Sequence, residues 1–81
     1  MSLFDKVKAL QKGDRIKVTS IAKLQSGQPK QYVGEFDDYE PRRGDFVFFV
    51  HVERGDTDLL GKPKTTRMQF INSTIRNVEK L

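Results

Sequence analysis

Apolar residues near the start of the chain recur at helical spacing, at Leu3, Phe4, Val7 and Leu10. Such spacing is typical of one face of an amphipathic helix. Ser2 stands at the N-cap position with Asp5 three residues later, and Gly13 is a residue type that commonly ends helices. The pattern predicts one short helix over about residues 3–11. Because so short a helix is unstable alone, we expect it to dock on the rest of the chain.

After Gly13 the apolar residues alternate with polar ones, which is the pattern of strands that are buried on one face. Five strands are predicted, at residues 14–24, 31–40, 45–53, 66–72 and 74–78. In the first strand Ile21 falls on the opposite parity to Ile16 and Val18, so we expect a bulge or bend near Ser20 that brings Ile21 back to their face. Turns are expected at residues 25–30 and 41–44, and a long hydrophilic hairpin loop at 54–65.

The second and fifth strands carry apolar residues three positions apart rather than two. Phe36 and Tyr39 are so spaced, and so are Ile75 and Val78. A flat strand would place the members of each pair on opposite faces. Gly34 tolerates a sharp bend just before the first pair. Five short strands, two of them bent, predict an all-β fold, a small and strongly curved barrel over about residues 14–80.

The third predicted strand is apolar on both parities, which is typical of a strand covered on both faces. Phe46, Phe48, Val50 and Val52 share one parity, and Val47 and Phe49 share the other. One face would fill the barrel, and the N-terminal helix or another chain would cover the second face. His51 lies on the second parity, where we expect a packed or interface histidine rather than a ligand.

An Arg-Gly-Asp tripeptide brackets this strand on each side, as Arg43-Gly44-Asp45 and Arg54-Gly55-Asp56. Each copy is interpreted as a turn, because glycine supplies the backbone freedom and aspartate favours turns. An adhesive role is not expected. The first copy runs into the strand, and the second is expected to begin the 54–65 loop.

Length and composition limit the number of domains and the ways in which the fold can be stabilised. The 81 residues predict one domain, 1–81, with a thin core. The chain has no cysteine and one histidine, so disulfides and cysteine-ligated zinc are excluded and no metal site or cofactor is expected. Oligomerisation is then the expected stabilising device. The first ten residues are too charged for a signal-peptide core, and no run approaches the roughly 18 apolar residues of a membrane helix, so we expect a cytoplasmic protein without a membrane partner.

Charge is distributed unevenly along the chain. Residues 1–30 carry seven Lys and Arg against two Asp, residues 31–61 carry three Arg against eight acids, and residues 62–81 carry five Lys and Arg against one Glu. The two ends are therefore basic and the middle is acidic. If both ends fold onto one face, that face could bind a polyanion, although mild basicity is also common in small soluble domains.

The order of the elements resembles the Sm-like family, which includes bacterial Hfq. The residues that carry the resemblance are Gly34-Glu35-Phe36-Asp37-Asp38-Tyr39-Glu40, the following turn and Asp45-Phe46-Val47-Phe48, and then residues 68–81. Asp45 stands where the family favours Asn, and Asn72-Ser73 replaces an Arg-Gly pair. The resemblance implies a closed homo-oligomeric ring in which strand 4 of one subunit pairs with strand 5 of the next. It also implies binding of single-stranded RNA near the pore.

The resemblance places RNA contacts in the loop before strand 3 and in the turn between strands 4 and 5. The candidate residues are Arg42, Arg43, Asp45, Asn72, Ser73 and Arg76. Arginine can grip phosphate or stack on a base, and asparagine can both donate to and accept from a base edge. The alternative for each is an ordinary solvated turn, with Asp45 as a turn-capping carboxylate.

Catalysis is not expected. The single histidine has no Ser or Asp partner at a telling spacing, and the acid pair Asp56 and Asp58 lacks the glutamate that would complete a calcium loop. We therefore expect a binding protein that is not an enzyme. The alternatives are a structural or adaptor barrel that binds protein partners, or a small DNA-binding barrel.

Overall fold

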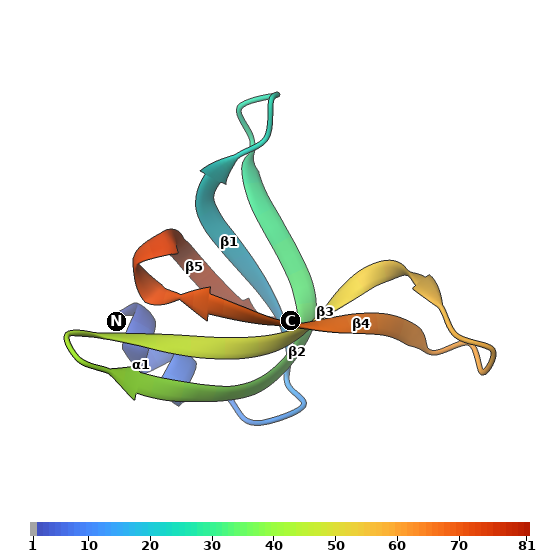
Figure 1. Cartoon of the computed structure of the whole chain (residues 1–81), viewed down its shortest axis with the longest axis horizontal. Coiled ribbons are helices and arrows are strands. Elements are labelled where there is room, and N and C mark those ends of the chain that lie inside the picture. Colours follow the sequence, from blue (N-terminus) through green and yellow to red (C-terminus); the bar gives the residue numbers. More distant parts are fainter. Residues whose placement is uncertain (1) are drawn as a thin grey trace.

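The structure is a computed structural model that describes residues 2–81, and it is built mostly from β-strands (Figure 1). Its elements are α1 (Leu3–Lys8), β1 (Arg15–Lys23), β2 (Pro29–Arg42), β3 (Asp45–Thr57), β4 (Pro63–Ile71), a 3-10 turn η1 (Asn72–Thr74) and β5 (Ile75–Lys80). A short N-terminal helix followed by five strands is the order that the sequence predicted.

The strands form one antiparallel sheet in the order β4-β3-β2-β1-β5. The strands are long and bent, and three hairpins project from the centre of the molecule in different directions (Figure 1). Within residues 2–81, β4 and β5 each pair with one neighbour and not with each other. The sheet is therefore not closed inside one chain, and it has two open edges.

The helix is shorter than predicted. It ends at Lys8 rather than near residue 11, with Ala9 as its C-cap. The Ser2 side chain accepts a hydrogen bond from the Asp5 N–H at 3.2 Å, which confirms the predicted N-cap. Beyond the helix, Asp14 accepts from the Gln11 N–H at 2.9 Å, and this interaction favours a turn over a further helical turn.

The bulge predicted near Ser20 is present, but it does not bury Ile21. Both pairings of β1 change register after Thr19. Ser20 turns inward, donating to the Thr74 carbonyl at 3.2 Å and accepting from the Ala22 N–H at 3.1 Å. Ile21 remains 54% exposed. The extra residue therefore anchors β1 to η1 through a hydroxyl instead of extending the apolar face.

The irregularity in β2 lies at Asp37 and not at Gly34. The register with β3 shifts between Phe36 and Asp38, so Asp37 is the additional residue. This shift lets Phe36 and Tyr39 pack against the same core, as their spacing suggested. Gly34 has another role, because a Cβ at this position would overlap the backbone carbonyl of His51 on β3. Glycine there permits the close approach of the two strands.

The predicted loop 54–65 is wrong in extent. β3 continues to Thr57 and β4 begins at Pro63, so only a tight turn separates them. The Arg54-Gly55-Asp56 copy thus lies inside a strand, where the register of β3 with β4 shifts between Glu53 and Thr57. The positive φ of Gly55, 88°, accommodates the irregularity. Composition suggested a loop, but cross-strand pairing overrides that preference.

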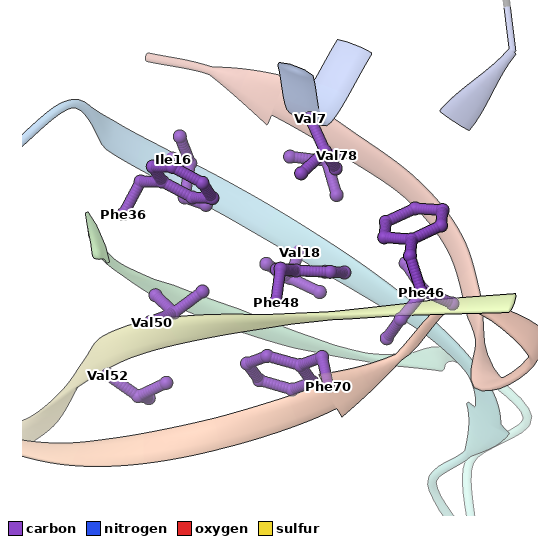
Figure 2. Close-up of a cluster of buried hydrophobic side chains, with 11 residues drawn as sticks. Val7, Ile16, Val18, Phe36, Phe46, Phe48, Val50, Val52, Phe70 and Val78 are labelled. Atoms are coloured by element: carbon purple, nitrogen blue, oxygen red, sulfur yellow. The ribbon is translucent and has the colours of Figure 1, made fainter. Parts of the chain in front are cut away.

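The core lies on the concave side of the sheet, where side chains from the helix and every strand meet (Figure 2). Its members are Val7, Ile16, Val18, Phe36, Phe46, Phe48, Val50, Val52, Phe70, Ile75 and Val78. The helix contributes Val7 to this cluster, and the Phe4 ring lies 4.7 Å from that of Phe46. The helix therefore packs with the core rather than on the second face of β3, where Val47 is buried within the chain and Arg67 lies over Phe49.

Candidate nucleic-acid interface

The first predicted RNA-binding loop is a tight hairpin turn between β2 and β3. Arg42 pairs with Asp45, so Arg43 and Gly44 form the turn, and Gly44 has a φ of 73°. Both arginines are exposed. The guanidinium of Arg42 donates to Glu40 at 3.3 Å, with both side chains about half exposed. Arg43 has no ion pair within residues 2–81, so it presents the less compensated charge.

Asp45 is half-buried at the start of β3, and its carboxylate is already engaged. The Phe46 N–H donates to Oδ1 at 2.8 Å. The second carboxylate oxygen can still accept, for example from a base amine, but it cannot donate. A carboxylate also repels phosphate, so this position suits a base edge better than a backbone.

The second predicted turn is η1, between β4 and β5. Asn72 is half-buried, and Ser73 is exposed. The turn is fixed from both sides, because Thr74 donates to the Ile71 carbonyl at 2.8 Å while its own carbonyl accepts from Ser20. Arg76 follows on β5 and is exposed.

The two turns lie side by side in the fold. A hollow of about 360 Å³ is lined by Ser2, Leu3, Phe4, Gly44, Asp45, Phe46 and Asn72. The structure therefore brings together Asp45 and Asn72, which are far apart in sequence. Arg42, Arg43, Ser73 and Arg76 do not line this hollow. The start of the helix contributes Ser2 and Phe4, for which the sequence predicted only helix capping and docking.

This hollow combines an aromatic wall with a few polar groups. Phe4 and Phe46 supply the apolar surface, while Asp45, Asn72 and Ser2 supply a carboxylate, an amide and a hydroxyl. A nucleobase could contact the apolar wall and exchange hydrogen bonds with the polar groups. The Phe46 side chain is almost fully buried, so only Phe4 could offer appreciable ring surface.

A separate, charged cluster lies around Asp37, and the sequence predictions did not include it. The Asp37 carboxylate accepts a hydrogen bond from Arg67 at 2.9 Å, and the Lys12 ammonium and the His51 ring nitrogen lie 3.5 and 3.6 Å away. The hydrogen bond from Arg67 is the main cause that lowers the pKa of Asp37. It outweighs the opposing effect of burial, and the charge of Lys12 adds to it.

The Asp37 cluster links elements across the outer face of β3. Arg67 on β4 also lies over the Phe49 ring, 4.1 Å from its centroid. The His51 side chain lies beside Asp37 and is 38% exposed. The only sequence signal for this cluster was the Phe36–Tyr39 spacing, which implied an irregularity in β2 without locating it.

Residues 2–81 contain no group of three or more His, Cys, Asp or Glu side chains arranged to hold a metal ion. None of the helices in this range has the length and apolar character that crossing a bilayer would require. No protein-family model, curated protein or solved structure matches the chain.

Proposed function

We propose that the protein is a non-catalytic, cytoplasmic RNA-binding protein that assembles as a homo-oligomeric ring of Sm-like barrels. The observation that carries the proposal is the sheet order β4-β3-β2-β1-β5, which leaves one open edge on β4 and another on β5. Single-stranded RNA is held near the pore by the two adjacent turns. The likeness of the motif residues 34–48 and 68–81 to the Sm-like family supports the same reading.

Pairing of β4 with β5 of a neighbouring subunit would satisfy both open edges. Exposed strand edges present unpaired N–H and C=O groups that favour association. A head-to-tail interface of this kind generates a closed ring when the rotation between subunits closes. Ile71, at the end of β4, is 42% exposed and would gain cover in such an assembly. Each subunit's bent sheet would then be completed as a barrel wall by its neighbour.

A ring would repeat the two turns around its axis. The hollow between Asp45 and Asn72 would receive a base, and Arg42, Arg43 and Arg76 would contact phosphates. Ser73 lies at the same turn and can donate to a phosphate or ribose oxygen. Repetition matters energetically, because several weak sites linked in one ring bind a single strand with avidity.

Oligomeric state and RNA binding can be measured independently. Size-exclusion chromatography with light scattering reports the mass, and binding to labelled uridine-rich and adenine-rich RNA is measured at two salt concentrations. We expect a mass of at least three times 9.4 kDa and an affinity that falls as salt rises. A monomer without salt-sensitive RNA binding would contradict the proposal.

Matched arginine variants locate the binding surface. Arg42→Ala and Arg76→Ala should each weaken RNA binding about three- to tenfold and reduce its salt dependence, because each removes a phosphate contact. Arg54→Ala is the control, because Arg54 is also exposed but lies in the β3–β4 hairpin. If the first two variants bind as tightly as the wild type, RNA does not bind at these turns.

A further inference from the structure

Two leucines at the tip of the β3–β4 hairpin stand free of the rest of the protein. Leu59 and Leu60 are 105% and 81% exposed, the highest values among the exposed large hydrophobic residues of the described chain. Their hairpin projects away from the helix and from the other two hairpins (Figure 1). Full exposure of two adjacent leucines is unfavourable in water, and neither side chain supports the core.

The turn that carries these leucines is organised by Asp58. Its Oδ1 accepts hydrogen bonds from the Leu60 N–H at 2.8 Å and the Lys62 N–H at 3.0 Å. The Asp58 N–H donates to the Lys62 carbonyl at 2.8 Å, and Gly61 closes the turn with a φ of 79°. The leucines are therefore displayed by an ordered turn, and their display costs little further conformational entropy on binding.

Basic and acidic side chains flank this apolar tip. Lys62 is two residues from Leu60, and Arg54 and Lys64 lie further down the two strands of the hairpin. Within residues 2–81, Arg54 and Lys62 have no ion pair, whereas Asp56 lies 3.9 Å from Lys64. Asp58 uses its carboxylate inside the turn. Residues 54–64 carry three basic side chains and the two carboxylates Asp56 and Asp58, so the hairpin end offers an apolar apex above a net charge of +1.

We propose that the Leu59–Leu60 tip inserts into the interface of a bilayer that contains anionic lipid. A lipid surface provides an apolar layer beneath negative headgroups, which complements the apex and the basic residues below it. The apolar part of the tip consists of Leu59 and Leu60, and leucine is among the apolar residues that interfacial segments bury at the headgroup boundary. This peripheral contact differs from the sequence expectation of no membrane partner, and it does not depend on RNA binding.

Vesicle co-sedimentation tests the proposal directly. The wild type should sediment with vesicles of phosphatidylglycerol and phosphatidylcholine, and much less with phosphatidylcholine alone. The double variant Leu59→Ser with Leu60→Ser should bind the anionic vesicles roughly tenfold more weakly, because it removes the inserted apolar groups. Ile21→Ser is the matched control, since Ile21 is also exposed but lies on β1, and it should bind like the wild type.

Two further measurements distinguish insertion of the tip from adsorption at the membrane surface. One is the dependence of binding on the charge at Lys62, and the other is the depth that the tip reaches in the bilayer. Lys62→Glu should weaken binding to anionic vesicles at least about fivefold, because it removes one favourable positive charge near the surface and adds a negative charge that the headgroups repel. The chain has no tryptophan, so Leu60→Trp adds a single reporter at the tip. Its fluorescence should shift to shorter wavelength with anionic vesicles and should be quenched by brominated lipid. No vesicle binding by the wild type, unchanged binding by the double serine variant, or a reporter that stays in water would each overturn the proposal.

Discussion

The two Arg-Gly-Asp copies are identical in sequence but occupy different structural settings. In the first copy, Arg43 and Gly44 form the tight turn between β2 and β3, and Asp45 begins the strand. In the second copy, all three residues lie within β3, where the register with β4 is irregular. Both glycines have positive φ, 73° for Gly44 and 88° for Gly55. The same backbone requirement therefore serves a turn in one place and a bulge in the other.

The difference shows that the structural role of each Arg-Gly-Asp copy depends on the segments that surround it and not on the tripeptide itself. The first copy lies beside η1 and the start of the helix, so Asp45 joins the lining of a hollow with Asn72. The second copy lies in the projecting β3–β4 hairpin, and all three of its residues are exposed. Only the first copy therefore enters the proposed RNA-binding surface.

The largest expected effect comes from removing the side chain that anchors β3 between the two copies. Phe48 is fully buried, and its ring stacks on that of Phe70 at 5.4 Å. Phe48→Ala should lower the free energy of unfolding by about 3–5 kcal/mol, because it leaves a cavity in a thin core. Urea denaturation measures the change. Leu59→Ala, in the exposed hairpin tip, is the control and should shift the free energy of unfolding by less than about 0.5 kcal/mol.

The next largest effect is expected from widening the gap between β2 and β3, close to the Arg54-Gly55-Asp56 copy. Gly34→Ala would place a methyl group against the backbone carbonyl of His51, which cannot rotate away. We expect a loss of about 1–3 kcal/mol, together with chemical-shift changes in the amides of β2 and β3 near Val52. A variant with wild-type stability would show that the two strands separate at little cost.

The two glycines of the comparison should respond alike in stability and differently in function. Gly44→Ala and Gly55→Ala each place a side chain in a left-handed conformation, although neither new methyl group meets a neighbour. Each should cost about 1–2 kcal/mol. RNA affinity should fall for the Gly44 variant and stay unchanged for the Gly55 variant. Equal losses of affinity would place the second copy on the binding surface as well.

The smallest effect concerns the outer face of β3 between the copies, where Asp37 holds three basic side chains. Its pKa is lowered in the folded protein from the ordinary 3.8. Asp37 therefore stabilises the fold above about pH 4, and this contribution is lost as the pH falls through the lowered pKa. Asp37→Asn should be less stable than the wild type at pH 7, and the difference should shrink under acid. Urea midpoints measured from pH 7 to pH 2 test this; a difference that does not change with pH would contradict it.

Local patterns sufficed for much of the fold. Ser2 and Asp5 predicted the start of the helix, and the parity break at Ile21 predicted the bulge near Ser20. The parity break between Phe36 and Tyr39 predicted a bend in β2. The sequence favoured Gly34 as its position because glycine tolerates bending, but the extra residue is Asp37. A spacing of three reveals that a residue is inserted, but not which one, because that depends on the partner strand.

The hairpin loop illustrates the opposite case. Residues 54–65 have the composition of a loop, and the sequence offers no sign that Arg54 to Thr57 pair with β4. The pairing is a property of two segments brought together, with the tight turn at Asp58 setting their register. The exposed position of Leu59 and Leu60 follows from that turn, so the apolar tip could not be anticipated from alternation alone.

The sequence by itself determined the element order, the alternating faces of the strands and the glycine turns, because these depend on neighbouring residues and on backbone freedom. Only the tertiary structure decided which distant groups meet. It placed Asp45 beside Asn72, gathered Lys12, His51 and Arg67 around Asp37, and left β4 and β5 as open edges. These contacts depend on how the bent sheet folds back on itself, and bending is set by cross-strand register, which no single segment encodes.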